Sequence, residues 1–566
     1  MSRFNLLDEP WIPVLPMGSE KQKEVSLIEL FRNAQDYQCL AGEMETQNFA
    51  MLRLLLAIVE TVFSRFDADG NPYPYITLDD RMVQTEPVDE DDIDDYTIDL
   101  DRTWDNIREQ GRFPEIVCTY LEKWKDHFYL LDEKFPFYQV TKEEMMEFVP
   151  SGKKPTTKTG KTVNLLISES ENKIALFSPI AKGTAENKTD GWKSELTEAQ
   201  LMRWLLTLQG YAGTADKTSL LAKGQQASKG WLFDIGGIYI KGDNLFETLL
   251  LNDIPYPPNA QNHISIQNPC WEHSGEDNVK SLLRERRISN YAELYTNWSR
   301  AAFIDPSWTP EQPAAIQIAK VASIAHMDHF IEPMTMWRLN KDGPDKGHQT
   351  PRKHRPEQAM WRSFGTIMLK ANGNGPDGVR RPEILNQLNR IRENRKISIC
   401  AISMQDDGNA TSWLPIDEIT DMLSMNELIA IDDTDNGWLV RINDIIENVT
   451  KPAVEIYRYF LQDIADIRAM DSKKKTVFVS VETEKFYQKL NDPFNNWLAS
   501  IQPGDEKAIK EEEWHDTLKR LLLAQGEKVM HTASIRDYRG IQKNDRQFNI
   551  FNAYAKFKNA VWKKLG

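Results

Sequence analysis

The stretch KFYQKLNDPFNNWL, residues 485–498, carries the periodicity of a helix near the end of the chain. Phe486, Leu490, Phe494 and Trp497 recur every three or four residues, so they lie on one face of a helix. Within it, Asp492-Pro493 is typical of an N-cap followed by a first-turn proline, which places a helix start at this dipeptide. The stretch therefore predicts an amphipathic helix with a buried aromatic face.

Three further apolar stripes lie before and after this segment in the sequence. Their members are Ile442, Ile445, Ile446 and Val449; Trp514, Leu518, Leu521 and Leu522; and Ile550, Tyr554, Phe557 and Val561. Amphipathic helices in this number and proximity are typical of a four-helix bundle. We expect an α+β chain in which residues 1–425 form a large mixed α/β domain and residues 426–566 form a four-helix bundle.

The N-terminal part shows both helical and strand-like patterns. Residues 45–63 and 196–208 predict helices, and residues 231–240 predict strands. Residues 4–14 predict a short strand broken by its prolines. Three polar stretches predict irregular structure: the acidic run 89–101 as a solvated loop, residues 151–161 as a flexible basic loop or hairpin, and residues 338–355 as an irregular basic stretch.

The charge of the chain is unevenly distributed. The 566 residues have a formal net charge of −16, which argues against a surface made basic throughout for non-specific nucleic-acid binding. From residue 514 to the end, however, eleven basic residues outnumber four acidic ones. A phosphate-facing surface on the bundle is one interpretation of this excess, and an ordinary basic helix surface is the other.

The four cysteines are widely spaced and include no C-x-x-C pair, which indicates neither a disulfide framework nor a zinc site. The first residues lack a basic segment followed by an apolar one, and no apolar run is long enough to span a bilayer. We therefore expect a cytoplasmic protein.

Familiar catalytic motifs are missing from the sequence. It contains no phosphate-binding G-x-x-x-x-G-K-[ST] loop, no H-E-x-x-H zinc motif and no G-x-S-x-G nucleophile motif. His326 and His329 could form part of a metal site, but such histidines are more often ordinary core or surface residues. We expect no enzyme activity, no cofactor and no metal.

Several strings, taken in order along the chain, resemble the CasA family. They are FNLLDEPWIPV (residues 4–14), WKDHFYLLDEKFPFYQV (124–140), NLLISESENKIALFSP (164–179), YTNWSRAAFI (295–304) and the KFYQKLNDPFNNWL segment. Their collinearity carries the resemblance, because the internal strings are short. Some relatives have a cysteine cluster in the N-terminal domain, and this chain lacks it.

The resemblance implies a function in CRISPR defence. CasA-like proteins are the large, non-catalytic subunits of the type I-E surveillance complex called Cascade. They contact the guide RNA and other Cascade subunits, read a protospacer-adjacent motif on double-stranded DNA, promote duplex opening and R-loop formation, and recruit a helicase–nuclease. In such systems the protein reads the motif while base pairing reads the target.

The resemblance also implies positions for the functional residues. Phe177 matches an aromatic residue at the guide-RNA handle, where a ring can stack on a base. Gly213, Thr214 and Lys217 match a glycine-rich loop that approaches the minor groove. Arg338 and Lys341 are candidates for the family's minor-groove lysine, whose readout would be degenerate.

A wedge below the motif is matched by Gln405, Gly408 and Asn409 of QDDGNATS, where an ordinary hairpin turn is the alternative. For the bundle, we expect Arg536, Arg539, Lys543 and Arg546 to contact the DNA backbone. Two rival functions remain open: a structural subunit of another nucleoprotein complex without motif recognition, and a hydrolase with a dispersed active site.

Overall fold

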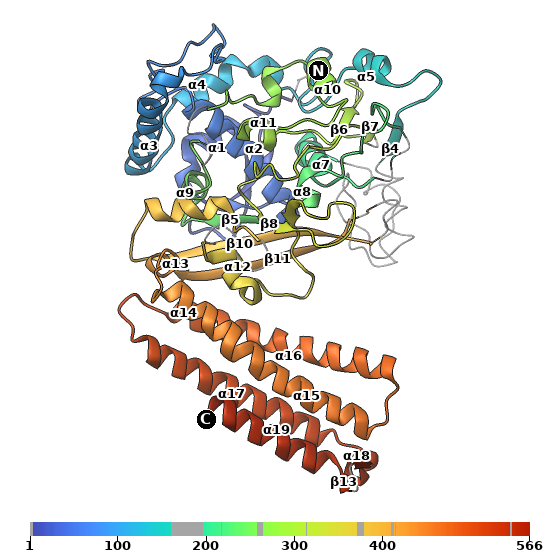
Figure 1. The fold of residues 1–566 in the computed structure, drawn as a ribbon. Helices are drawn as coiled ribbons and strands as arrows, with labels where there is room; N and C mark the ends of the chain where they lie inside the picture. The colour runs from blue at the N-terminus through green and yellow to red at the C-terminus, as the bar shows by residue number, and fades with distance from the viewer. Residues whose placement is uncertain are drawn as a thin grey trace. The chain divides into compact units, whose positions relative to one another are not determined.

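The structure is a computed structural model that describes residues 4–159, 196–214, 216, 218–256, 264–312, 314–370, 379–408, 413, 415–543 and 546–566; for residues 158, 159, 543 and 546 it describes the backbone alone. The chain forms two compact units. Unit 1 comprises residues 1–354, 382–387 and 400–420, and unit 2 comprises residues 355–381, 388–399 and 421–566. The described part confirms the expected α+β class (Figure 1).

Unit 1 contains helices and small sheets. Its helices are α1 (Leu27–Asn33), α2 (Glu45–Phe63), α3 (Ile93–Gln110), α4 (Ile116–Lys123), α5 (Lys142–Phe148), α7 (Glu198–Tyr211), α8 (Trp231–Asp234), α9 (Leu245–Leu251), α10 (Gly275–Ser281) and α11 (Tyr291–Tyr295). Its strands are β1 (Ile12–Pro16), β2 (Lys23–Val25), β3 (Tyr37–Leu40), β4 (Thr156–Thr159), β5 (Gly237–Lys241), β6 (Arg300–Phe303), β7 (Ala315–Lys320), β8 (Met336–Leu339) and β9 (Gln349–Arg352). The strand orders are β2-β1-β3, β4-β7-β6 and β8-β9.

Helix α2 is the core element of unit 1. It has the bounds expected from the sequence, and every residue from Thr46 to Phe63 is buried. A helix that is apolar on all sides belongs in the interior of a protein. Of the described helices, α2 alone has the length and composition to cross a membrane, and its complete burial identifies it as a core helix.

Two expectations about unit 1 are wrong. The acidic run 89–101 is largely helical, because α3 begins at Ile93 and buries Tyr96, Leu100 and Trp104 along one face. Their spacing of four residues outweighs the acidic composition of this run in determining the structure. Residues 231–240, expected to form strands, begin instead with the short helix α8 and form β5 from Gly237.

The other irregular segments also differ in part from expectation. The strand expected over residues 4–14 begins only at Ile12 and includes Pro13, in β1 between β2 and β3. The basic stretch 338–355 contains the end of β8, the connecting segment and the whole of β9, which pairs antiparallel with β8. Residues 156–159 of the basic segment 151–161 form β4, paired with β7. The helix expected over 196–208 is α7.

Two long strands run through both units. β10 (Lys396–Asp406) and β11 (Pro415–Asn426) form a three-stranded sheet with β5, in the order β11-β10-β5. The sequence-based division at residue 425 treats the chain as two consecutive blocks. In the structure, residues 355–381 and 388–399 belong to the same compact unit as residues 421–566.

Unit 2 is dominated by four long helices: α15 (Lys451–Ile467), α16 (Ser472–Ser500), α17 (Lys507–His531) and α19 (Ile550–Leu565). They pack side by side (Figure 1). Shorter elements accompany them: α12 (Phe364–Met368), α13 (Glu427–Ala430), α14 (Trp438–Asp444), a π-helical turn (Ile445–Thr450), α18 (Ile535–Arg539), β12 (Ile541–Lys543) and β13 (Arg546–Phe548).

Aromatic side chains fill the space between these helices. The rings of Phe460 and Phe557 stack at 4.8 Å, and Trp514 donates a hydrogen bond to the Thr450 hydroxyl at 2.9 Å. The helix start expected at Asp492-Pro493 is wrong: α16 begins at Ser472, capped by Asp471, and Pro493 lies inside it. The aromatic face on both sides of Pro493 keeps one continuous helix.

Candidate nucleic-acid interface

Strand β5 supports the two hairpins that carry Arg338 and Gln405, two of the residues predicted to contact DNA. On one side it pairs with β10, the strand that carries Gln405. On the other side Gly237 forms an antiparallel bridge with Thr335, at the base of the β8–β9 hairpin. A Cβ at Gly236 would lie 2.5 Å from the Arg352 carbonyl oxygen, so a glycine is required for this close approach. The two hairpins therefore share one support.

The β8–β9 hairpin presents its basic candidates to solvent. Arg338 is exposed on β8 and pairs in register with Thr350, and Lys341 is exposed in the connecting segment. The Asn340 side chain donates to the His348 carbonyl and the Thr350 hydroxyl, both at 3.0 Å, which braces that segment. Both candidates thus lie on a supported, solvent-accessible hairpin.

The base of this hairpin rests on a buried ion pair. Arg53 of α2 donates to both carboxylate oxygens of Glu332, at 2.6 and 2.8 Å. The same carboxylate accepts from the Trp231 indole at 2.5 Å and from the backbone of Met334 at 3.1 Å. A buried carboxylate with this many donors is well compensated for its lost hydration. Arg53, which interrupts the apolar run of α2, fixes the chain that leads into β8.

The tip of the β10–β11 hairpin begins with a tight turn. Asp406 accepts a hydrogen bond from the Gly408 backbone at 2.9 Å, and Gly408 has a φ of +68°, which glycine adopts readily. Gln405 is half-buried on β10. Asn409, the third wedge candidate, lies outside the described residues.

Lys353 neutralises the carboxylate of this turn. Its ammonium lies 3.1 Å from Asp406 and 4.0 Å from the centre of the Phe233 ring. Burial lowers the pKa of Lys353, while Asp234 and Asp406 act in the opposite direction. Because Lys353 directly follows β9, this pair places the base of one hairpin beside the tip of the other. The positive charge of Lys353 therefore compensates the negative charge of Asp406, which would otherwise repel a phosphate group.

The loop that follows α7 also comes close to the segment between β10 and β11. Lys229 pairs with Asp234 at 2.6 Å, and its ammonium lies 4.9 Å from the ring of Trp413, in the segment between β10 and β11. Lys229 ends the long loop that follows α7. Lys229, Lys353 and Trp413 were not selected from the sequence. Lys229 and Lys353 lie in glycine-containing or basic stretches, a signal too general to single them out, and Trp413 has no such signal.

Buried Arg300 gathers the start and the end of that loop. It donates to the carbonyls of Gly213 and Ser228 and forms an ion pair with Asp216 at 2.7 Å. Gly213 is buried, and Thr214 is half-buried with its carbonyl 3.4 Å from the Lys320 ammonium. Lys217 lies outside the described residues. Arg300 therefore fixes the loop next to Lys229.

The candidates in unit 2 lie around α18. Arg536 and Arg539 are exposed, and Arg536 also donates to the Ile467 carbonyl at 3.3 Å. Between them Asp537 is buried and paired with Arg468 at 3.0 Å. Burial alone would raise the pKa of Asp537, but hydrogen bonds from Arg468 and Ser534 lower it. Lys543 and Arg546 face each other in the β12–β13 pair, with their side chains outside the described part.

The histidines considered as metal ligands bond elsewhere. His326 contacts the Ile324 carbonyl at 2.9 Å, and His329 contacts the Ile288 carbonyl at 2.5 Å. Asp328 between them pairs with His348 at 2.6 Å. Within the described residues, no group of three or more His, Cys, Asp or Glu side chains could hold a metal ion. The four cysteines are free thiols.

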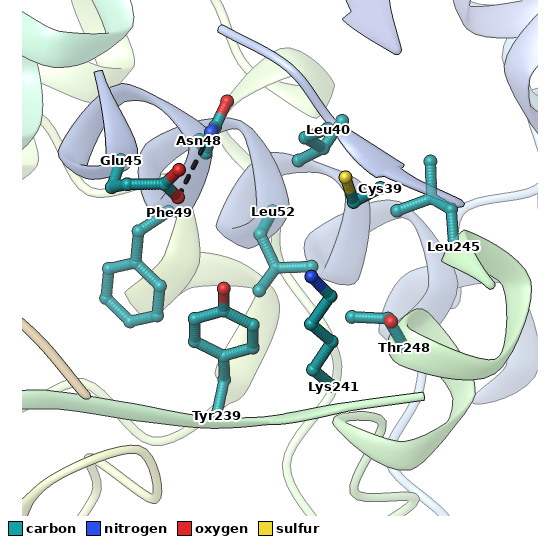
Figure 2. Close-up of a pocket in the computed structure, with 10 residues that line it drawn as sticks. All are labelled: Cys39, Leu40, Glu45, Asn48, Phe49, Leu52, Tyr239, Lys241, Leu245 and Thr248. Atoms are coloured by element: carbon teal, nitrogen blue, oxygen red, sulfur yellow. Dashed lines mark hydrogen bonds between the residues drawn. The ribbon is translucent and has the colours of Figure 1, made fainter. Parts of the chain in front are cut away.

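A separate pocket lies between β3, α2, β5 and α9 (Figure 2). It has a cavity volume of about 70 Å³, and Leu40, Leu52 and Leu245 are among the residues that line it. Lys241 and the Cys39 thiol also line it, and burial raises the pKa of that thiol. The candidates from the sequence do not line this pocket. Phe177, the candidate for the guide-RNA handle, lies outside the described residues.

Comparison with known proteins decides the family. The model of the family described as CRISPR-associated protein Cse1 matches residues 5–525. The chain belongs to the Cse1 family. The resemblance seen in the sequence is thereby confirmed.

A curated relative, CRISPR-associated protein CasA/Cse1 of Thermus thermophilus, is 27% identical over 278 residues, which are 48% of this chain and 42% of the relative. The match thus spans less than half of that relative's length. Thermobifida fusca Cse1 has the same fold, with a TM-score of 0.73 at 22% identity over 100% of this chain and 98% of that chain. A chain of a structure named CRISPR RNA-guided surveillance complex gives a TM-score of 0.66 at 14% identity over 99% of both chains.

Proposed function

We propose that this chain is the non-catalytic large subunit of a type I-E CRISPR surveillance complex and acts in the cytoplasm. In that complex it binds guide RNA and partner subunits, recognises a protospacer-adjacent motif on double-stranded DNA and promotes duplex opening. The observation that carries the proposal is the Cse1 family match over residues 5–525.

The geometry of unit 1 supports the motif-reading part. The loop after α7, the base of the β8–β9 hairpin and the tip of the β10–β11 hairpin meet around Lys229, Lys353 and Asp406. In this proposal Arg338 and Lys341 enter the minor groove, where readout separates A·T from G·C but little more. Thr214 and Lys217 take part in the same readout in this proposal, whereas Gly213 is buried and its carbonyl is bound by Arg300, so it does not touch DNA.

The tip of β10–β11 acts as the wedge. Duplex opening costs a few kcal/mol for the first unstacked step, after which guide pairing roughly balances the DNA pairing that is lost. Gln405 and Asn409 hold the opened junction in this proposal, and Gly408 supplies the tight turn that follows β10. Phe177 contacts the guide-RNA handle, and the basic residues around α18 contact the DNA backbone. R-loop formation then recruits the helicase–nuclease.

The test is motif discrimination by the assembled complex. Guide-loaded partner subunits are mixed with this chain and with duplexes that share one target but differ in the flanking motif, and binding is measured by gel shift. We expect this chain to make binding depend on the flanking motif. Uniform binding to all duplexes would contradict the proposal and favour a structural subunit without motif recognition.

A further inference from the structure

Helix α19 presents aromatic and basic side chains to solvent on one face. Phe551 is 56% exposed and Trp562 is 50% exposed. They are eleven positions apart, which at 3.6 residues per turn places them within about 20° of each other around the helix axis. Lys558 is exposed and falls between them on the same face. We call Phe551, Lys558 and Trp562 the α19 stripe.

Each end of the α19 stripe is extended by a neighbouring helix. The ring of Tyr538, on α18 and 45% exposed, lies 5.6 Å from the ring of Phe551 at an angle of 37°. The ammonium of Lys519, on α17, lies 3.8 Å from the ring centre of Trp562. Aromatic surface and positive charge therefore alternate across three helices of unit 2.

The charge of α19 selects an anionic partner. Its sequence contains Lys556, Lys558, Lys563 and Lys564 and no acidic residue. Lys556 is paired with Asp463 at 2.7 Å, so it is held within the unit. On α18, Arg536 and Arg539 add exposed positive charge next to Tyr538.

Large aromatic side chains grouped on an exposed face mark a binding surface. Aromatic rings interleaved with cations suit single-stranded nucleic acid, because its unpaired bases can stack on the rings while its phosphates lie near the cations. In a duplex the bases are already stacked on one another, so exposed rings gain little.

We propose that the α19 stripe, together with Tyr538 and Lys519, binds single-stranded nucleic acid. This inference rests on the proposed function, since opening a target duplex releases one unpaired strand that needs a surface to hold it. The proposed function gives unit 2 only contacts to the DNA backbone, which any DNA could make. This inference adds a ligand class, a single strand whose bases stack on aromatic side chains.

The test uses the full chain and a fluorescein-labelled oligothymidine, with binding followed by anisotropy. Phe551→Ala and Trp562→Ala should each weaken binding roughly tenfold, the order expected for loss of one stacked base. Lys558→Ala should instead reduce the salt slope by about 0.7, as for one lost phosphate contact on a single strand. Tyr459→Ala is the matched control, because Tyr459 is 56% exposed on α15, a helix that carries no member of the stripe; it should change affinity less than twofold.

Conservative variants separate stacking from folding. Phe551→Tyr and Trp562→Phe retain a ring and should bind oligothymidine nearly as wild type does. Binding of the alanine variants to a matched duplex should change less than twofold. Unchanged oligothymidine affinity in both alanine variants, or an equal loss for single strand and duplex, would overturn the inference.

A protein partner on this face would give a different result. If the alanine variants lost assembly with the other complex subunits but kept their oligothymidine affinity, the stripe would be a protein-docking surface and the inference would be wrong. Motif discrimination on duplexes, measured in the same variants, reports on the proposed function separately. If the variants kept motif discrimination and their affinity for oligothymidine did not depend on the aromatic rings, this inference would be wrong while the proposed function would stand.

Discussion

Glu60 and Asp253 form a buried carboxyl pair in unit 1. Both are almost completely buried, Glu60 in α2 and Asp253 shortly after α9. Burial raises the pKa of Glu60 well above its usual value, and the nearby Asp253 raises it further. The Ile254 backbone donates to Glu60 at 3.0 Å and opposes this shift only in part. The folded state therefore binds a proton that the unfolded chain releases more readily.

This pair predicts that stability falls as pH rises. Between the ordinary carboxyl pKa and the raised pKa of folded Glu60, the folded state holds more protons than the unfolded state, so the free energy of unfolding decreases with pH. Glu60→Gln removes this contribution and keeps an acceptor for Ile254. We expect the variant to gain stability relative to wild type as pH increases from 5 to 8, by up to about 1.4 kcal/mol per pH unit.

Chemical denaturation at several pH values measures the difference. Glu143→Gln, a change at an exposed position of α5, is the control and should show no such trend. A constant stability difference between Glu60→Gln and wild type across this range would mean that Glu60 titrates alike in the folded and unfolded states.

Single residues were the hardest features to predict from sequence. Arg53 lies within the apolar sequence of α2, where no local pattern indicates a partner, yet it pairs with Glu332, 279 positions away. Arg300 was part of a string that resembled a family, and its role in holding Gly213 and Ser228 depends on folding. Contacts between residues so far apart leave no periodic pattern in the sequence, so the partners of Arg53 and Arg300 could not be identified from the sequence alone.

At the scale of elements, the helical spacing of apolar residues predicted several of the helices. α2, α7, α16, α17 and α19 were found because their buried faces repeat at helical spacing. The stripe from Ile442 to Val449 instead lies on α14 and the π-helical turn, so the long helix α15 that follows them was not predicted. α3 was missed because its acidic residues outnumber the apolar ones on its buried face. In α16 the local signal of Asp492-Pro493 was overridden by packing on both sides. Local composition is the weaker guide when an apolar stripe crosses it.

The β10–β11 hairpin gives a prediction at this scale. Lys353→Met keeps an apolar stem near Phe233 but leaves the Asp406 carboxylate unpaired beside the proposed wedge. Since that charge would repel phosphate, motif-dependent DNA binding by the assembled complex should weaken several-fold. Adding Asp406→Asn to Lys353→Met should restore most of the loss, because the uncompensated charge is gone.

Gel shifts of the single and double variants measure this coupling, with Lys134→Met at an exposed position as the control. If Asp406→Asn failed to restore binding, Lys353 itself would contact DNA, and its pairing with Asp406 would be incidental. If Lys353→Met bound as wild type, the pair would have no part in recognition.

At the scale of the whole molecule, the sequence resemblance indicated the family and the structure shows which selected segments meet. The loop after α7 and the two hairpins converge through Arg300, Lys353 and β5, contacts that link residues far apart in the chain. Phe177, Lys217 and Asn409 lie outside the described residues, so their roles remain predictions from the resemblance. We propose that these converging segments open duplex DNA beside a recognised motif.

The most direct test compares R-loop formation on two targets, an intact duplex and one already unpaired beside the motif. The assembled complex carries either wild-type chain or the double variant Gln405→Ala with Asn409→Ala. We expect the variant to form R-loops more slowly on the intact duplex and at the wild-type rate on the pre-opened target. Equal slowing on both targets, or no slowing on either, would show that Gln405 and Asn409 do not hold the opened junction.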